Sequence, residues 1–192
     1  MVAPPLDDPA AVGAWLADRL DEEGIPHALG GAVALAAHGI PRNTADVDMS
    51  VFVAEDEHDR LFDALERAGC LFDRAHAAGL LRRISLFTVR CGRIQVDLFV
   101  AFHPHHGESL TRRVKLRCPD GRERWFLSAE DLAVYKLALS RPKDLMDLEL
   151  LFAARAGAID VAYVRRWIEA IAGAGDPRSA RIDDLVRRFG PG

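Results

Sequence analysis

The amino-acid sequence predicts an α/β fold with a mixed, largely antiparallel sheet flanked by helices and a helical C-terminal part. A predicted strand of apolar residues interrupted by two carboxylates spans 46–53, and residues 80–89 and 93–100 form a predicted hairpin. Apolar residues recur at helical spacing before, between and after these strands. We expect residues 1–127 to form one domain and residues 128–192 a helical part packed on it, either separate or within one continuous domain.

The first half of the chain alternates helices with short strands. Asp8 is a good N-cap and Pro9 suits the first helical position, so we expect the first helix to begin there. Gly39, followed by Pro41, ends a short helix that comes after a Leu29-Gly30-Gly31 turn. The predicted elements of this half are helices at 9–23, 32–38 and 55–68, strands at 25–29 and 46–53, and a short edge strand at 71–74.

The second half begins with the hairpin and then becomes helical. Ser128-Ala129-Glu130-Asp131 opens a helix with a start that resembles a capping box, and Arg141-Pro142 breaks it. The other predicted elements are strands at 80–89, 93–100, 112–118 and 122–127, helices at 143–156, 161–172 and 182–189, and a linker at 173–176.

The composition is that of a soluble globular protein, with 49% apolar and 28% charged residues. Residues 1–8 lack a basic start and an apolar core, so we expect no signal peptide. No apolar run approaches the roughly 20 residues of a membrane span, so we expect no membrane partner. The three cysteines are scattered without a CxxC pair, which favours reduced thiols in a cytoplasmic protein.

Two carboxylates lie close together on the predicted strand 46–53. Successive side chains of a strand point to opposite faces, so Asp46 and Asp48 share one face while Val47 and Met49 share the other. Like charges at this spacing repel, and an apolar strand is a costly place for them. A hard cation between them relieves this cost, and Mg²⁺ prefers oxygen ligands. The pair therefore predicts a magnesium site.

A third carboxylate interrupts the second arm of the predicted hairpin. Asp97 lies between Val96 and Leu98, where a lone charge is expensive unless it is paired, hydrogen-bonded or metal-bound. An aspartate at the end of a strand, facing solvent, is the alternative. Because two carboxylates are already placed, we expect Asp97 to join Asp46 and Asp48.

These residues occur in an ordered pattern. Gly30-Gly31, His38-Gly39 and Arg42-x-Thr44-x-Asp46-x-Asp48, with a further carboxylate on a later strand, resemble the signature of the polymerase-beta-like nucleotidyltransferase superfamily. The resemblance is closest to the abortive-infection nucleotidyltransferase toxins of toxin–antitoxin pairs and extends over residues 25–152. Many members have Gly-Ser where this chain has Gly-Gly, so the serine contact with phosphate does not transfer. The toxin branch commonly has Gly-Gly.

The resemblance implies a nucleotidyltransferase that moves a nucleoside monophosphate from an NTP such as ATP to an acceptor hydroxyl and releases pyrophosphate. Asp46 and Asp48 would hold two Mg²⁺ ions and the triphosphate, while Asp97 would complete one metal site and help take a proton from the acceptor. The implied nucleotide-binding residues are Gly30, Gly31, Arg42, Thr44, Lys136, Lys143, Asp144 and Asp147. Thr44 is expected chiefly to fix its loop.

Lysine is rare in this chain, with three residues against 22 arginines. A lysine ammonium is a compact point charge, so keeping Lys136 and Lys143 in an arginine-rich chain favours a phosphate contact. Lys143-Asp144-x-x-Asp147 also resembles a motif that the toxin branch carries after its sheet. An ordinary structural role in a helix is the alternative. Asp144 favours a helix N-terminus, and Lys143 can pair with Asp147 one turn along.

The acceptor stays open between a tRNA 3′ end, a protein Ser, Thr or Tyr, and a small molecule such as an aminoglycoside or lincosamide antibiotic. A toxin would also have an antitoxin partner. The alternative from another class is a non-catalytic nucleotide- or RNA-binding module of the same fold. His103, His105 and His106 offer a third hypothesis, a zinc-binding loop, although Pro104 and Gly107 predict an ordinary exposed loop.

Overall fold

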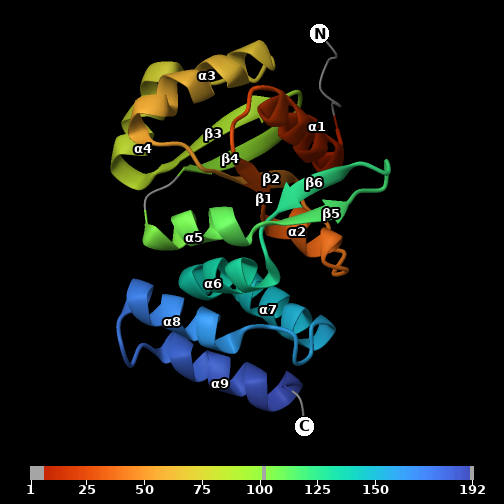
Figure 1. The fold of residues 1–192 in the computed structure, drawn as a ribbon, viewed down its shortest axis with the longest axis vertical. Helices are drawn as coiled ribbons and strands as arrows, with labels where there is room; N and C mark the ends of the chain where they lie inside the picture. The colour runs from red at the N-terminus through yellow and green to blue at the C-terminus, as the bar shows by residue number, and fades with distance from the viewer. Residues whose placement is uncertain (1–6, 101–102, 191–192) are drawn as a thin grey trace. The chain divides into compact units, whose positions relative to one another are not determined.

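The computed structural model describes residues 7–100 and 103–190 and divides the chain into two compact units (Figure 1). One unit comprises residues 1–37 and 41–127 and contains the sheet. The other comprises residues 38–40 and 128–192 and is helical. Each unit has its own buried apolar core, and the residues proposed above for chemistry are divided between them.

The first unit is built on a sheet with strand order β3-β4-β2-β1-β6-β5. The β2–β4 and β1–β6 pairs are parallel, and the β1–β2, β3–β4 and β5–β6 pairs are antiparallel. The predicted α/β class with a mixed sheet is therefore confirmed. The strands are β1 (His27–Leu29), β2 (Asp46–Val51), β3 (Leu86–Cys91), β4 (Ile94–Val100), β5 (Val114–Arg117) and β6 (Glu123–Phe126).

One face of the two central strands is buried and the other carries polar groups. Val47 and Met49 of β2 and Val96 and Leu98 of β4 are fully buried, as the alternation of strand side chains requires. Helix α1 (Pro9–Glu22) packs closely on this apolar face. A Cβ added to Gly13 of α1 would lie 3.1 Å from Leu29, so the small residue permits the close approach.

Further helices complete the first unit. Aromatic rings join α3 to β3, because Phe62 and Phe72 lie with their centroids 5.6 and 6.0 Å from that of Phe87. Helices α3 and α4 lie beside the β3–β4 hairpin (Figure 1). These elements are α2 (Gly31–Ala37), the 3₁₀ turn η1 (Glu55–Glu57), α3 (His58–Arg67), α4 (Arg74–Ile84) and α5 (Pro104–Arg112).

The second unit is a group of helices with a buried polar contact in its core. The fully buried carboxylate of Asp131 accepts hydrogen bonds from the hydroxyls of Tyr163 at 2.6 Å and Ser128 at 2.7 Å. Across the described residues, no helix has the length and apolarity to cross a membrane. The helices are α6 (Ala129–Leu139), α7 (Pro142–Ala154), α8 (Val161–Ala172) and α9 (Pro177–Phe189).

Four local predictions are wrong. Helix α9 begins at Pro177, five residues before the start of the helix expected at 182–189, because Asp176 is its N-cap and Pro177 suits the first helical position. Residues 80–84 belong to helix α4, which ends at Ser85 in a left-handed conformation, so strand β3 begins only at Leu86. The exposed loop expected after the hairpin is helix α5, in which His103 is the N-cap and Pro104 the first helical residue. The edge strand at 71–74 is reduced to a single bridge between Leu71 and Arg90.

A buried arginine fastens α1 to β6. Arg124 is 3% exposed, and its guanidinium donates to both carboxylate oxygens of Asp18 at 2.9 Å and to Asp120 at 2.8 and 3.0 Å. This contact holds the pKa of Asp120 at about 2. Two-pronged pairs of this kind are specific to guanidinium, because its planar fork matches a carboxylate.

We expect Arg124→Met to lower the free energy of unfolding by about 3 kcal/mol, because it leaves the partly buried carboxylate of Asp18 with fewer donors. Denaturant unfolding measures the change. Arg117→Met, at an exposed position on the neighbouring strand β5, is the control and is expected to change stability by under about 0.5 kcal/mol. Equal effects of the two substitutions would contradict the fastening role.

Candidate active site

Strand pairing brings the three predicted carboxylates onto one face of two neighbouring strands. In the parallel pair β2–β4, Asp48 is aligned with Asp97 and Asp46 with Gln95. Adjacent strands lie about 4.8 Å apart, and residues at an interval of two share a face. Asp46, Asp48 and Asp97 are each partly exposed, in contrast to the apolar residues between them. This is the arrangement that the sequence predicts.

Neighbouring side chains hold two of the carboxylates in place. The hydroxyl of Thr44 donates to Oδ1 of Asp46 at 2.6 Å, in line with the expectation that Thr44 fixes its loop. The hydroxyl of Thr88 at 2.6 Å and the amide of Gln95 at 3.0 Å donate to Oδ1 of Asp97. Among the described residues, none donates a hydrogen bond to Oδ2 of Asp97, so this oxygen is available to a ligand.

Thr88 and Gln95 are site residues that the sequence prediction missed. Thr88 faces Asp97 across the β3–β4 pair, and Gln95 precedes Asp97 by two residues on the same strand face. A signal for Gln95 was present in the sequence, since an interval of two places it beside Asp97. Thr88 can be identified only from the register of the β3–β4 hairpin. The sequence prediction started strand β3 too early, so it did not give this register.

The Gly30-Gly31 turn makes room for Asp48. Gly31 has φ +54, and a Cβ added there would lie 1.8 Å from Oδ2 of Asp48, a separation that no pair of non-bonded atoms adopts. The N–H of Gly30 donates to the carbonyl oxygen of Asp48 at 2.9 Å. The absence of a side chain at residue 31 is therefore a condition for the position of the Asp48 carboxylate.

The donor set suits Mg²⁺ bound together with a phosphate ligand. All three groups are carboxylates, and Gly31 leaves the space beside Asp48 without a Cβ. In residues 7–100 and 103–190, no three His, Cys, Asp or Glu side chains converge closely enough to hold a metal by themselves. Mg²⁺ is usually bound through one or two carboxylates plus substrate phosphates, so a site without a complete protein cage fits this ion.

Comparison with solved structures identifies the fold. The antibiotic-resistance factor ANT(2″)-Ia in its solution structure aligns with a TM-score of 0.59 and 14% identity, covering 93% of this chain and 97% of that one. An antigenic nucleotidyltransferase-like protein from Paracoccidioides brasiliensis aligns with a TM-score of 0.50 and 17% identity, covering 93% and 94%. The chain has a nucleotidyltransferase fold. No family model and no curated protein matches the sequence.

Four predicted nucleotide-binding residues lie in the second unit of this nucleotidyltransferase fold, and three of them contact one another there. The ammonium of Lys136 lies 2.7 Å from Asp147 and 3.2 Å from Asp144, and all three side chains are buried. Arg141 also donates to Asp144 at 2.6 Å. Lys143 is exposed, and the expected pairing with Asp147 is made by Lys136 instead. A nucleotide contact by these residues remains a prediction.

The remaining predicted residues have identifiable surroundings. Arg42 is half-buried in the loop before β2. His105 and His106 are buried in α5, where the ring of His106 lies 4.7 Å from that of Phe52, so they do not form an exposed loop. Nδ1 of His38, at the end of α2, lies 2.7 Å from the guanidinium of Arg155. His105 and His106 thus belong to the packing of the nucleotidyltransferase fold.

We expect Gly31→Ala to lower the free energy of unfolding by about 3 kcal/mol, because the new methyl group collides with Asp48 in addition to the strain of positive φ. Gly69→Ala is the control, since Gly69 has φ +82 but nothing within 4 Å of an added Cβ. Combining Gly31→Ala with Asp48→Ala should recover at least about 1 kcal/mol in a double-mutant cycle. Additive effects would show that the two residues do not compete for space.

We expect Lys136→Met to lower the free energy of unfolding by about 3 kcal/mol, because the buried carboxylates of Asp144 and Asp147 lose the ammonium that they share. Lys143→Met should have little effect. Burial raises the pKa of Asp144, but hydrogen bonds from Arg141 and Lys136 outweigh it and lower this pKa. The stabilisation is therefore present above about pH 4 and is lost as the pH falls, so the wild type and the Lys136→Met variant should converge in acid. Equal stability of the two lysine variants at pH 7 would contradict this role.

Proposed function

We propose that this protein transfers a nucleoside monophosphate from an NTP to an acceptor hydroxyl, with release of pyrophosphate. The observation that carries the proposal is the alignment of Asp48 with Asp97 in neighbouring parallel strands, with Asp46 on the same face. The nucleotidyltransferase fold raises the expectation of this chemistry. The proposed function depends on the carboxylates, because a fold alone does not determine an activity.

Each acidic side chain has a separate part in the proposed reaction. Asp46 and Asp48 would hold Mg²⁺ together with the triphosphate of the NTP, and we propose two ions with Asp97 as a ligand to one. Bound Mg²⁺ neutralises phosphate charge and stabilises the charge that develops on the leaving oxygen. Asp97 would accept the proton of the acceptor hydroxyl, for which it must lie within hydrogen-bond reach of the incoming oxygen.

The neighbours of these carboxylates set their geometry. Thr44 fixes Oδ1 of Asp46, while Thr88 and Gln95 fix Oδ1 of Asp97. We propose that Oδ2 of Asp97 contacts the ligand. Such preorganisation matters because reacting atoms must meet within a few tenths of an ångström. Gly30 and Gly31 lie at the start of α2, and Arg42 lies in the loop that leads from α2 to β2. We propose that these three residues contact the triphosphate.

Finer aspects of the function follow from the sequence resemblance and are proposed on that basis. The base of the NTP stays open, with ATP as one candidate. Lys136, Lys143, Asp144 and Asp147 are proposed to bind nucleotide. The role of a toxin with an antitoxin partner, in the cytoplasm, is likewise a prediction. A tRNA, a protein and a small molecule are the candidate acceptors.

We expect wild-type protein with Mg²⁺ and α-labelled NTP to transfer label to an acceptor in bulk tRNA, cell lysate or an antibiotic panel. Asp48→Asn and Asp97→Asn should each reduce transfer by at least about 100-fold, because each replaces a carboxylate by a neutral amide of nearly the same size. Asp73→Asn is the control, at the exposed N-cap of α4. Binding of NTP without transfer by the wild type would favour the alternative, a non-catalytic nucleotide-binding module.

A further inference from the structure

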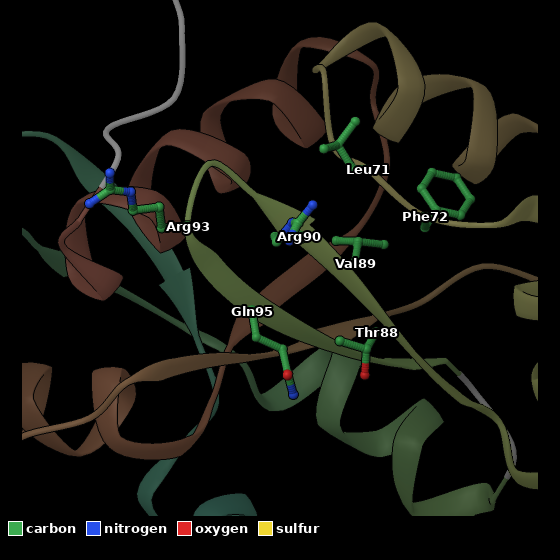
Figure 2. A pocket seen from close by; sticks show the side chains of 7 residues that line it. All are labelled: Leu71, Phe72, Thr88, Val89, Arg90, Arg93 and Gln95. Atoms are coloured by element: carbon green, nitrogen blue, oxygen red, sulfur yellow. The ribbon is translucent and has the colours of Figure 1, made fainter.

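A cavity opens on the outer side of the β3–β4 hairpin. Its volume is about 520 Å³, enough for a small ligand or one end of a larger one. Figure 2 shows Leu71 and Phe72 on one side of it, Thr88 and Gln95 on the other, and Arg90 between them. Val89 and Arg93 complete the lining.

This cavity adjoins the candidate catalytic carboxylate. Thr88 and Gln95 line the cavity, and the same two side chains donate hydrogen bonds to Oδ1 of Asp97. The hairpin register aligns Arg90 with Gln95 and Thr88 with Asp97. Arg90 and Asp97 are therefore two strand residues apart on neighbouring strands, a distance of about 7 Å along the strand direction.

The charge of the lining selects among ligands. Among the described residues of the lining, Arg90 and Arg93 carry charge and none is a carboxylate. Arg93 lies 3.5 Å from Asp7, and both side chains of this contact are exposed. Arg90 is exposed and forms no ion pair with any described residue, so its guanidinium is available to an anion. A guanidinium binds phosphate oxygens through two parallel hydrogen bonds, whereas it repels a protonated amine.

We propose that this cavity is the acceptor subsite and that the acceptor is a phosphate ester with a free hydroxyl. This inference rests on the proposed function. Arg90 binds the phosphate of the acceptor, Leu71 contacts its apolar part, and its hydroxyl reaches Oδ2 of Asp97. The spacing between Arg90 and Asp97 matches a phosphate and a hydroxyl carried by one small unit, such as a nucleotide or a sugar phosphate.

The transfer step balances without a further reactant. The acceptor oxygen forms a bond to the α-phosphorus of the NTP as its proton passes to Asp97. The bond from the α-phosphorus to the bridging oxygen breaks, and pyrophosphate leaves with the electron pair. Arg90 takes no part in these bond changes, so its effect falls on acceptor binding.

The test measures transfer of label from α-labelled NTP to three purified acceptors. These are a short oligoribonucleotide with a free 3′ hydroxyl, glycerol phosphate, and tobramycin as a polycationic comparison. We expect a phosphate ester to be labelled in preference to tobramycin, and the first two arms distinguish a nucleic-acid end from a small phosphate ester. Arg90→Gln should raise the KM for that acceptor at least about tenfold and leave the KM for NTP within about twofold. Arg117→Gln, exposed on the opposite edge strand β5, is the matched control and should change neither value.

Two outcomes overturn the inference while leaving the proposed function in place. One is efficient labelling of tobramycin with none of either phosphate ester, and the other is an unchanged acceptor KM in Arg90→Gln.

Calorimetry of Mg²⁺-dependent NTP binding to wild type and Asp48→Asn distinguishes failure of the proposed function from failure of the acceptor inference. Binding lost in Asp48→Asn supports the nucleotide site, so absence of labelled phosphate ester would then overturn the acceptor class alone. Absence of NTP binding to wild type would overturn the proposed function and this inference with it.

Discussion

The parallel register of β2 against β4 is the constraint on which the candidate site depends. It aligns Asp48 with Asp97, and the buried residues Val96 and Leu98 keep β4 in that register. Because side chains alternate with a period of two, a slip by one residue would turn Asp97 into the apolar core. The hydrophobic face of the sheet thus determines the position of the acidic face.

Three carboxylates on two neighbouring strands repel one another, and solvent exposure and nearby hydrogen-bond donors reduce the cost of this repulsion. Each is partly exposed, and Thr44, Thr88 and Gln95 supply hydrogen-bond donors to two of them. The third, Asp48, lies against Gly31, where any side chain would displace it. Three like charges this close together do not stabilise the folded state. A ligand that brings positive charge explains them better, since functional sites accept destabilising groups.

Local patterns were readable from the sequence, whereas contacts between distant segments were not. The shared face of Asp46 and Asp48 follows from the strand period, and Pro9 after Asp8 marked the first helix where the structure has it. The end of α4 at Ser85 was missed because a non-glycine residue adopts the left-handed conformation there. The pairing of Lys136 with Asp144 and Asp147 depends on how two helices pack, which spacing within one helix does not reveal.

Residues of the β3–β4 hairpin orient Asp97, the proposed base, and also form a wall of the adjoining cavity. Thr88 and Gln95 take part in both, so a change at either position alters the cavity and the hold on Asp97 together. Arg90 differs, because it lines the cavity without contacting Asp97 by any hydrogen bond within the described chain. Recognition of the acceptor can therefore change at Arg90 while the geometry of the carboxylates is preserved. The residues proposed to orient the chemistry are thus separate from the residue proposed to select the substrate.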